Sequence, residues 1–156
     1  MSEVLVPTLD LLAFYASNKG PEVQANAGAP GGVGAEIQIA VPESELWYIH
    51  NVHGRIQYGA AGSQIYTLAL LHKNLPIVGG GLSETCLAQN ELRAGQNSGG
   101  KAYVTYASPQ PYFAPAGSIF SLEVADATGG FTGVTFQVEV LFTQVSSFPG
   151  ATSPSV

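Results

Sequence analysis

The sequence predicts an all-β protein, a jelly-roll-like β-sandwich of about eight strands that follows an N-terminal arm. Three observations lead to this fold class. Many of the short apolar runs alternate with polar residues, and this period of two is typical of strands with one buried face. Nineteen glycines and ten prolines gather between these runs, where turns are expected. The body of the chain carries no helical periodicity, which favours a sandwich or a barrel.

Composition narrows the possible functions. Only 10% of the 156 residues are charged, so the surface is either coated with neutral polar groups or covered within an oligomer or larger assembly, and we favour the second interpretation. The net charge is −6 and the five basic residues are scattered, which argues against nucleic-acid binding. No apolar stretch approaches the roughly 18 residues of a membrane helix. Cys86 is the single cysteine, and we expect it to fill a small buried apolar site.

The N-terminal region, residues 1–35, is predicted to be an arm followed by a Gly-rich linker. Val4 to Tyr15 is apolar and contains Pro7, which suits either a short helix or an extended arm. Gly20 to Ala35 has almost no apolar bulk and is interpreted as a flexible linker. Such an arm could reach a neighbouring subunit or fold back on its own domain.

Residues 36–145 form the predicted sandwich. Glu36 to Val41 alternates as a strand, and a turn follows at residues 42–45. The next strand, Leu46 to Val52, is bulky on both faces, so we expect Trp47 at the interface between the sheets or at a subunit contact. Ile65 to His72 is almost continuously apolar, which predicts a central strand covered on both sides.

The second half of the sandwich contains two predicted loops and a predicted hairpin. The loops are Asn90 to Gly100 and the proline-rich segment Ser108 to Pro115. Residues 119–125 and 134–145 both alternate strongly and are separated by turn residues, so they are expected to pair as a β-hairpin covered by another sheet. Residues 146–156 are predicted to be a flexible tail.

The sequence gives little support for a catalytic or metal-binding site. His50 and His53 are three residues apart on a predicted strand, so we expect them on opposite faces, unlike the His-x-His pair of a cupin metal site. A metal-dependent, cupin-like enzyme is therefore the least favoured class. The chain has no Gly-x-Ser-x-Gly elbow, and we predict neither an enzyme nor a bound cofactor. Six aromatic residues could form a sugar-stacking surface, although core or interface positions are commoner: Tyr58, Tyr66, Tyr103, Tyr106, Tyr112 and Phe113.

Two segments carry a resemblance to a known group of proteins. Ala40 to Val52, with its Pro-Glu-Ser-Glu-Leu-Trp sequence, and Tyr112 to Phe120, with its Pro-Ala-Gly turn, resemble small jelly-roll structural proteins of tailed bacteriophages. Some of these are cement or decoration proteins of the capsid, and others are fibre or tail components. The resemblance implies a homotrimer on the capsid surface of the virion. Its partner would be the major capsid protein, whose subunits it would bridge to stabilise the phage head.

The residues expected to contact the capsid or a neighbouring subunit are apolar. Most lie in the arm, where the alternative is that they cap their own core: Leu5, Leu9, Leu12, Phe14 and Tyr15, together with Trp47 in the sandwich. A second possible function is a tail or fibre module that binds a host-surface glycan. In that case the two loops, Asn90 to Gly100 and Ser108 to Pro115, would form the binding site.

Overall fold

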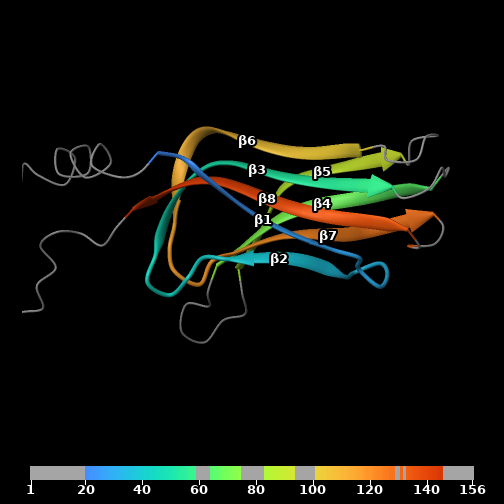
Figure 1. Ribbon diagram of the computed structural model, residues 1–156, viewed down its shortest axis with the longest axis horizontal. Helices are drawn as coiled ribbons and strands as arrows, with labels where there is room; N and C mark the ends of the chain where they lie inside the picture. The colour runs from blue at the N-terminus through green and yellow to red at the C-terminus, as the bar shows by residue number, and fades with distance from the viewer. Residues whose placement is uncertain are drawn as a thin grey trace, which may run out of the picture.

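The computed structural model describes residues 20–58, 64–74, 83–93, 101–128, 131 and 133–145 (Figure 1). The predicted contact residues of the arm and the predicted tail, residues 146–156, lie outside this part of the chain. The described residues form eight strands: β1 (Glu22–Gly28), β2 (Glu36–Ala40), β3 (Leu46–Tyr58), β4 (Ile65–Asn74), β5 (Ser83–Arg93), β6 (Lys101–Ala114), β7 (Ile119–Thr128) and β8 (Val134–Val145). Within the same residues, no helix is long and apolar enough to cross a membrane.

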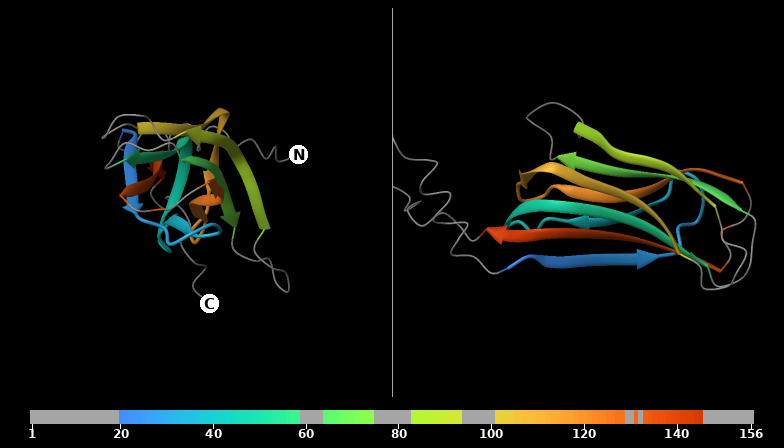
Figure 2. Two further views of the ribbon diagram at one scale, coloured as in Figure 1. Left: turned by 90° about the vertical axis from the view of Figure 1, so that its right-hand side faces the viewer. Right: turned by 90° about the horizontal axis from the view of Figure 1, so that it is seen from above.

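The strands form two four-stranded antiparallel sheets, and Figure 2 shows the sandwich from the strand ends (left) and from above (right). One sheet has the order β1-β8-β3-β6, and the other has the order β2-β7-β4-β5. Apart from the β4–β5 pair, each strand that follows another in the sequence lies in the opposite sheet. This is the jelly-roll arrangement, in which two interleaved Greek keys close a sandwich. The predicted fold class is therefore confirmed.

The predicted C-terminal hairpin is wrong, although both of its arms are strands. β7 pairs with β2 and β4, whereas β8 pairs with β1 and β3 in the other sheet. The two apolar faces, which contain Phe120 and Leu122 on one strand and Phe136 and Val138 on the other, both belong to the core. Alternation shows which side chains of a strand are buried, but it does not show which strand is its hydrogen-bonded partner.

Part of the predicted linker is also a strand. Glu22–Gly28 pairs with β8 along its whole length, from Glu22 opposite Phe142 to Gly28 opposite Phe136. β1 lies at the edge of its sheet and is mostly exposed, so backbone hydrogen bonds hold it with little apolar burial. The side-chain amide of Asn26 also donates a hydrogen bond of 2.8 Å to the backbone oxygen of Gln38, which joins β1 to β2.

Several strands extend beyond their predicted ends. Residues 90–93 belong to β5 and residues 108–114 belong to β6, so neither predicted loop is wholly a loop. The predicted turns, in contrast, are present: the backbone of Glu45 donates to Pro42, and that of Ser118 donates to Pro115. Gly117 has a φ of 78° within the second turn, a left-handed conformation that favours glycine. The central-strand prediction also holds, because residues 68–72 of β4 are buried on both faces.

Trp47 lies in the core between the sheets. Its ring stacks on Phe142 with the ring centroids 3.8 Å apart, and its indole nitrogen donates a 2.5 Å hydrogen bond to Glu45. The side chain is completely buried. Of the two expected positions for Trp47, the structure shows the sheet–sheet interface. Its side chain therefore has no exposed surface with which to contact a capsid or a neighbouring subunit.

Gly54 lies in the core and Cys86 lies on the surface. Gly54 of β3 faces the core, where a methyl group would lie 2.5 Å from Cδ1 of Leu122 and 2.8 Å from Cγ1 of Val104. The absence of a side chain therefore lets the two sheets approach closely at this point. Cys86 lies on the edge strand β5 and is exposed, so the prediction of a buried cysteine is wrong.

Candidate functional site

The outer face of the β1-β8-β3-β6 sheet carries a cluster of polar and aromatic side chains around two residues of β3. His53 and Arg55 point away from the core because Gly54 between them points into it. The strand register places partners on both sides of this pair: Glu139 and Gln137 on β8, and Thr105 and Tyr103 on β6. Three neighbouring strands therefore bring together residues that are far apart in the sequence.

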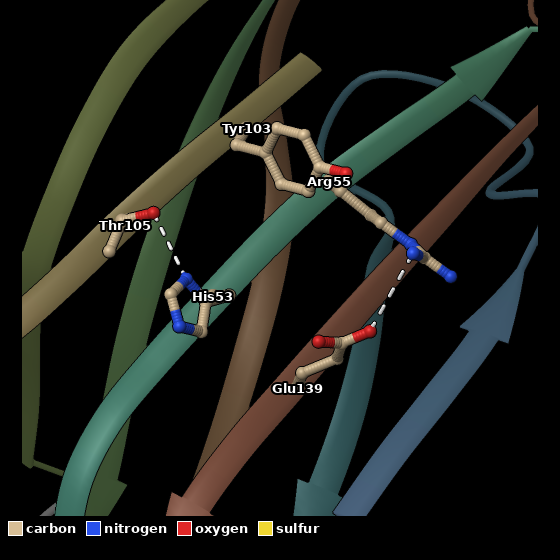
Figure 3. Close-up of a pocket in the computed structure, with 5 residues that line it drawn as sticks. All are labelled: His53, Arg55, Tyr103, Thr105 and Glu139. Carbon is tan, nitrogen blue, oxygen red and sulfur yellow. Dashed lines mark hydrogen bonds and ion pairs between the residues drawn. The ribbon is translucent and has the colours of Figure 1, made fainter. Parts of the chain in front are cut away.

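These side chains enclose a hollow of about 280 Å³ (Figure 3). It is lined by His53, Arg55, Tyr103, Thr105 and Glu139. We refer to these five residues as the outer-face hollow. Every one of them comes from a strand, so the hydrogen-bonded sheet beneath them fixes their backbone positions.

One side of the outer-face hollow is a hydrogen-bonded trio. Nη1 of Arg55 lies 3.8 Å from Oε1 of Glu139, and Nη2 of Arg55 donates to the side-chain oxygen of Gln137. The amide nitrogen of Gln137 donates in turn to Oε1 of Glu139 at 2.6 Å. Gln137 thus bridges the two charged groups and restricts their rotamers. The charges of Arg55 and Glu139 cancel, so this side is polar without net charge.

The other side of the outer-face hollow is formed by His53, Thr105 and Tyr103. Nδ1 of His53 lies 3.0 Å from the hydroxyl oxygen of Thr105, which fixes the plane of the imidazole ring. Figure 3 shows the second ring nitrogen on the side away from Thr105. Tyr103 lies on the edge strand β6 and is 52% exposed, so its ring is accessible from solvent.

His50 also lies on this outer face, so the expectation that His50 and His53 point to opposite faces is wrong. A β-bulge between Ile49 and Asn51 inserts one residue into β3 relative to β8 and shifts the alternation. Nε2 of His50 contacts the hydroxyl of Thr143 at 2.8 Å, and burial lowers the pKa of His50. Among the described residues, no group of three or more His, Cys, Asp or Glu side chains could hold a metal ion.

The six aromatic residues considered as a sugar-stacking surface are divided between the core and this face. Tyr66 is fully buried in the core, and Tyr106 and Tyr112 are partly buried against it, with the hydroxyl of Tyr112 3.4 Å from Nδ1 of His72. Tyr103 and Phe113 are exposed on the outer face, where Phe113 packs against Tyr48 with the ring centroids 5.0 Å apart. The side chain of Tyr58 lies outside the described part of the structure.

The opposite sheet carries an ionic cluster around Lys73 of β4. The ammonium group of Lys73 donates to Glu36 and lies 3.4 Å from the carboxylate of Glu84. Burial raises the pKa of Glu36, but hydrogen bonds from Lys73 and Gln38 outweigh this effect and hold the pKa below its usual value. The cluster joins β2, β4 and β5 across one sheet. We interpret it as structural, because it ties three strands of the sheet together.

The sequence indicated only part of the outer-face hollow. His53 was considered as a metal ligand and Tyr103 as a sugar-stacking residue, but Arg55, Thr105 and Glu139 were not predicted. The missing signal is the strand register, which places these residues side by side and cannot be read from alternation alone. Of the predicted contact residues, Trp47 lies in the core, and those of the arm lie outside the described residues.

Comparison with known proteins shows similarity in fold. No family model matches the chain, and no curated protein matches it. A solved structure of the capsid of Ralstonia phage GP4 contains a chain that is 16% identical, with a TM-score of 0.51 over 83% of this chain and 88% of that one. A chain of Tomato aspermy virus is 12% identical, with a TM-score of 0.38 over 97% of this chain and 100% of that one. The xylan-binding domain CBM22-1 of Paenibacillus barcinonensis Xyn10C is 13% identical, with a TM-score of 0.36 over 84% and 86% of the two chains.

Proposed function

We propose that this chain is a virion structural protein, a cement or decoration protein that stabilises a phage head by bridging major capsid subunits. The observation that carries the proposal is the jelly-roll fold, shared with a chain from the capsid of Ralstonia phage GP4 over most of both chains. The sequence adds independent support, because two of its segments resemble structural proteins of tailed phages. A capsid surface position and a homotrimeric state belong to the same proposal.

The two phage-like segments meet in space, which strengthens the resemblance. Ala40 to Val52 includes the turn between β2 and β3, and Tyr112 to Phe120 includes the turn between β6 and β7. The backbone of Val41 donates to Ser118 at 2.8 Å and accepts from Gly117 at 2.9 Å. The two segments that resemble phage proteins therefore lie together at one end of the sandwich, where their turns are hydrogen-bonded to each other.

The composition of this chain suits the binding that a cement protein requires. Such a protein stabilises a shell through buried contacts, and each large apolar side chain removed from water contributes roughly 1.5–3 kcal/mol. We propose that Leu5, Leu9, Leu12, Phe14 and Tyr15 supply these contacts from the arm. Three linked copies would add avidity, so no single contact needs to be strong. The low content of charged residues, 10%, reduces the desolvation that a large contact requires.

The test uses the full-length chain and a variant in which Leu5, Leu9 and Leu12 are replaced by serine. Light scattering gives the mass of each protein, and co-sedimentation with capsid shells that lack this protein gives binding. A trimer that binds shells and loses binding in the variant is the expected result. A full-length protein that does not bind the shells would contradict the cement role, and binding that the variant retains would exclude the arm as the contact. The variant is preferable to truncation at Glu36, because truncation would also delete β1.

A further inference from the structure

The outer-face hollow has the chemistry of a binding site for an uncharged ligand. Its two charged residues, Arg55 and Glu139, form an ion pair in which Gln137 takes part. An anionic ligand would approach a carboxylate in a chain whose net charge is −6, and a cationic ligand would have to compete with Arg55 for Glu139. Neither sign of charge is favoured. A ligand with neutral polar groups meets no such penalty.

The polar groups that remain suit hydroxyls better than any other common ligand group. A hydroxyl both donates and accepts hydrogen bonds, so neighbouring hydroxyls can donate to the Glu139 carboxylate and accept from the Arg55 guanidinium. The contact with Thr105 orients the ring of His53, whose Nε2 can meet a third hydroxyl. These groups are positioned before any ligand arrives, which lowers the entropy cost of binding.

Tyr103 supplies the apolar part of the site. It is 52% exposed, and its ring stands beside Arg55 at the rim of the hollow in Figure 3. A sugar ring has one face of C–H groups that packs against an aromatic ring, while its hydroxyls point sideways to polar partners. The volume of about 280 Å³ is slightly below the roughly 300 Å³ at which pockets for drug-sized ligands begin, so it suits one ring.

We propose that the outer-face hollow binds one unit of a neutral saccharide, with Tyr103 packing against the sugar ring and Arg55, Glu139 and His53 bonding its hydroxyls. This site lies on the sheet face formed by β3, β6 and β8, and none of its five residues belongs to the two segments that were considered as glycan-binding loops. None of its residues belongs to the arm, which supplies the proposed capsid contact. The two proposals therefore depend on different residues and can be tested separately.

The experiment is a titration of the full-length, isotope-labelled protein followed by amide NMR shifts. The neutral probes are methyl glucoside, methyl galactoside, methyl xyloside and N-acetylglucosamine, and the charged probes are N-acetylneuraminic acid and inorganic phosphate. We expect saturable shifts of the amides of Arg55, Tyr103 and Glu139 with at least one neutral sugar. Stronger binding of a charged probe, or no saturable shift with any neutral probe up to high millimolar concentration, would overturn the proposal.

Three variants distinguish a specific site from non-specific weak binding. Tyr103→Ala and Glu139→Gln should each weaken binding of the neutral probe about tenfold, equivalent to about 1.4 kcal/mol. Phe113→Ala removes another exposed aromatic residue from the same strand and face, outside the hollow, and should leave affinity unchanged. Equal affinity of Tyr103→Ala and the wild type would refute the proposed stacking. Tyr103→Ala should also retain shell binding, so failure of this proposal and failure of the cement role give different results.

Discussion

Replacing Gly54 with alanine tests how closely the two sheets pack. Gly54 lies on a central strand, and its missing side chain faces β7 and β4 of the opposite sheet. An alanine methyl would lie 2.5 Å from Cδ1 of Leu122, 2.8 Å from Cγ1 of Val104 and 3.1 Å from Cδ2 of Leu70. Two of these distances are shorter than real methyl contacts, so the neighbours must move. All three neighbours are buried, and the β-branched Val104 has restricted rotamers.

The expected loss of stability follows from these distances. Inserting a methyl into a packed core costs about 1–3 kcal/mol. Replacing a strand glycine returns roughly 0.5–1 kcal/mol, because alanine loses less conformational entropy on folding. The net destabilisation should therefore be on the order of 1–2 kcal/mol. For a chain of this size, each kcal/mol lowers the melting temperature by about 2–4 °C.

The assay is denaturation followed by the fluorescence of Trp47, which is the single tryptophan and is buried in the core. Protein concentration is held constant, because association would otherwise change the midpoint. Gly28→Ala is the matched control: this is also a strand glycine, and a methyl there would meet only Ile37, at an ordinary distance of 3.7 Å. Gly28→Ala should be neutral or slightly stabilising.

A Gly54→Ala variant that is as stable as Gly28→Ala would refute close packing of the sheets at this point. A double-mutant cycle sharpens the test. Leu122→Ala alone should cost about 2–5 kcal/mol, because it leaves a cavity. Combined with Gly54→Ala it should cost less than the sum, since the new methyl then occupies space that Leu122 has vacated. A coupling energy below about 0.5 kcal/mol would mean that the two residues do not contact each other.

Three further predictions concern titratable and reactive groups. Burial lowers the pKa of His72, so protonation of this residue favours the unfolded chain. Its contribution to stability should be constant above about pH 6.5 and should decrease at lower pH, by at most about 1.4 kcal/mol per pH unit. His72→Phe should therefore show a shallower loss of stability between pH 7 and pH 5 in the same assay. Lys73→Met leaves the partly buried Glu36 without its cation and should lower the free energy of unfolding by about 1–2 kcal/mol, whereas Lys101→Met on the exposed surface should change it by less than about 0.5 kcal/mol. Cys86 is exposed and should react with a thiol reagent in the native protein as fast as in the denatured one; protection in the native state would contradict its exposed position.

The sequence was sufficient to predict the sandwich but not its connections. Alternation in Val134–Val145 correctly identified a strand and its buried face. The same signal could not show that β8 pairs with β1 and β3, because alternation is a property of one strand and pairing is a property of two. β1 was interpreted as a linker because an exposed edge strand needs few apolar side chains. Its backbone hydrogen bonds leave no compositional signal.

The outer-face hollow was harder to predict for two reasons. Its residues come from three strands, and their proximity depends on how β3 is aligned with β6 and β8 after the irregularity between Ile49 and Asn51. That bulge also reversed the expected direction of His50, since one extra residue shifts every later side chain to the other face. Polar residues such as Thr105 and Glu139 look in the sequence like any solvent-facing position of a strand. Only the folded sheet shows that they surround one hollow.

The interleaved strand order has a consequence for synthesis of the chain. β8 is the shared partner of β1 and β3, so β1 cannot complete its pairing until Phe142 has left the ribosome, and β3 cannot do so until Val145 has. Most other pairings also join distant parts of the sequence, and such folds form slowly, in milliseconds to seconds. During translation the apolar side chains of β3 and β4 therefore stay exposed to solvent until β7 and β8 have been synthesised. We expect the nascent chain to be a substrate for chaperones, and its yield to improve when translation is slowed by low temperature.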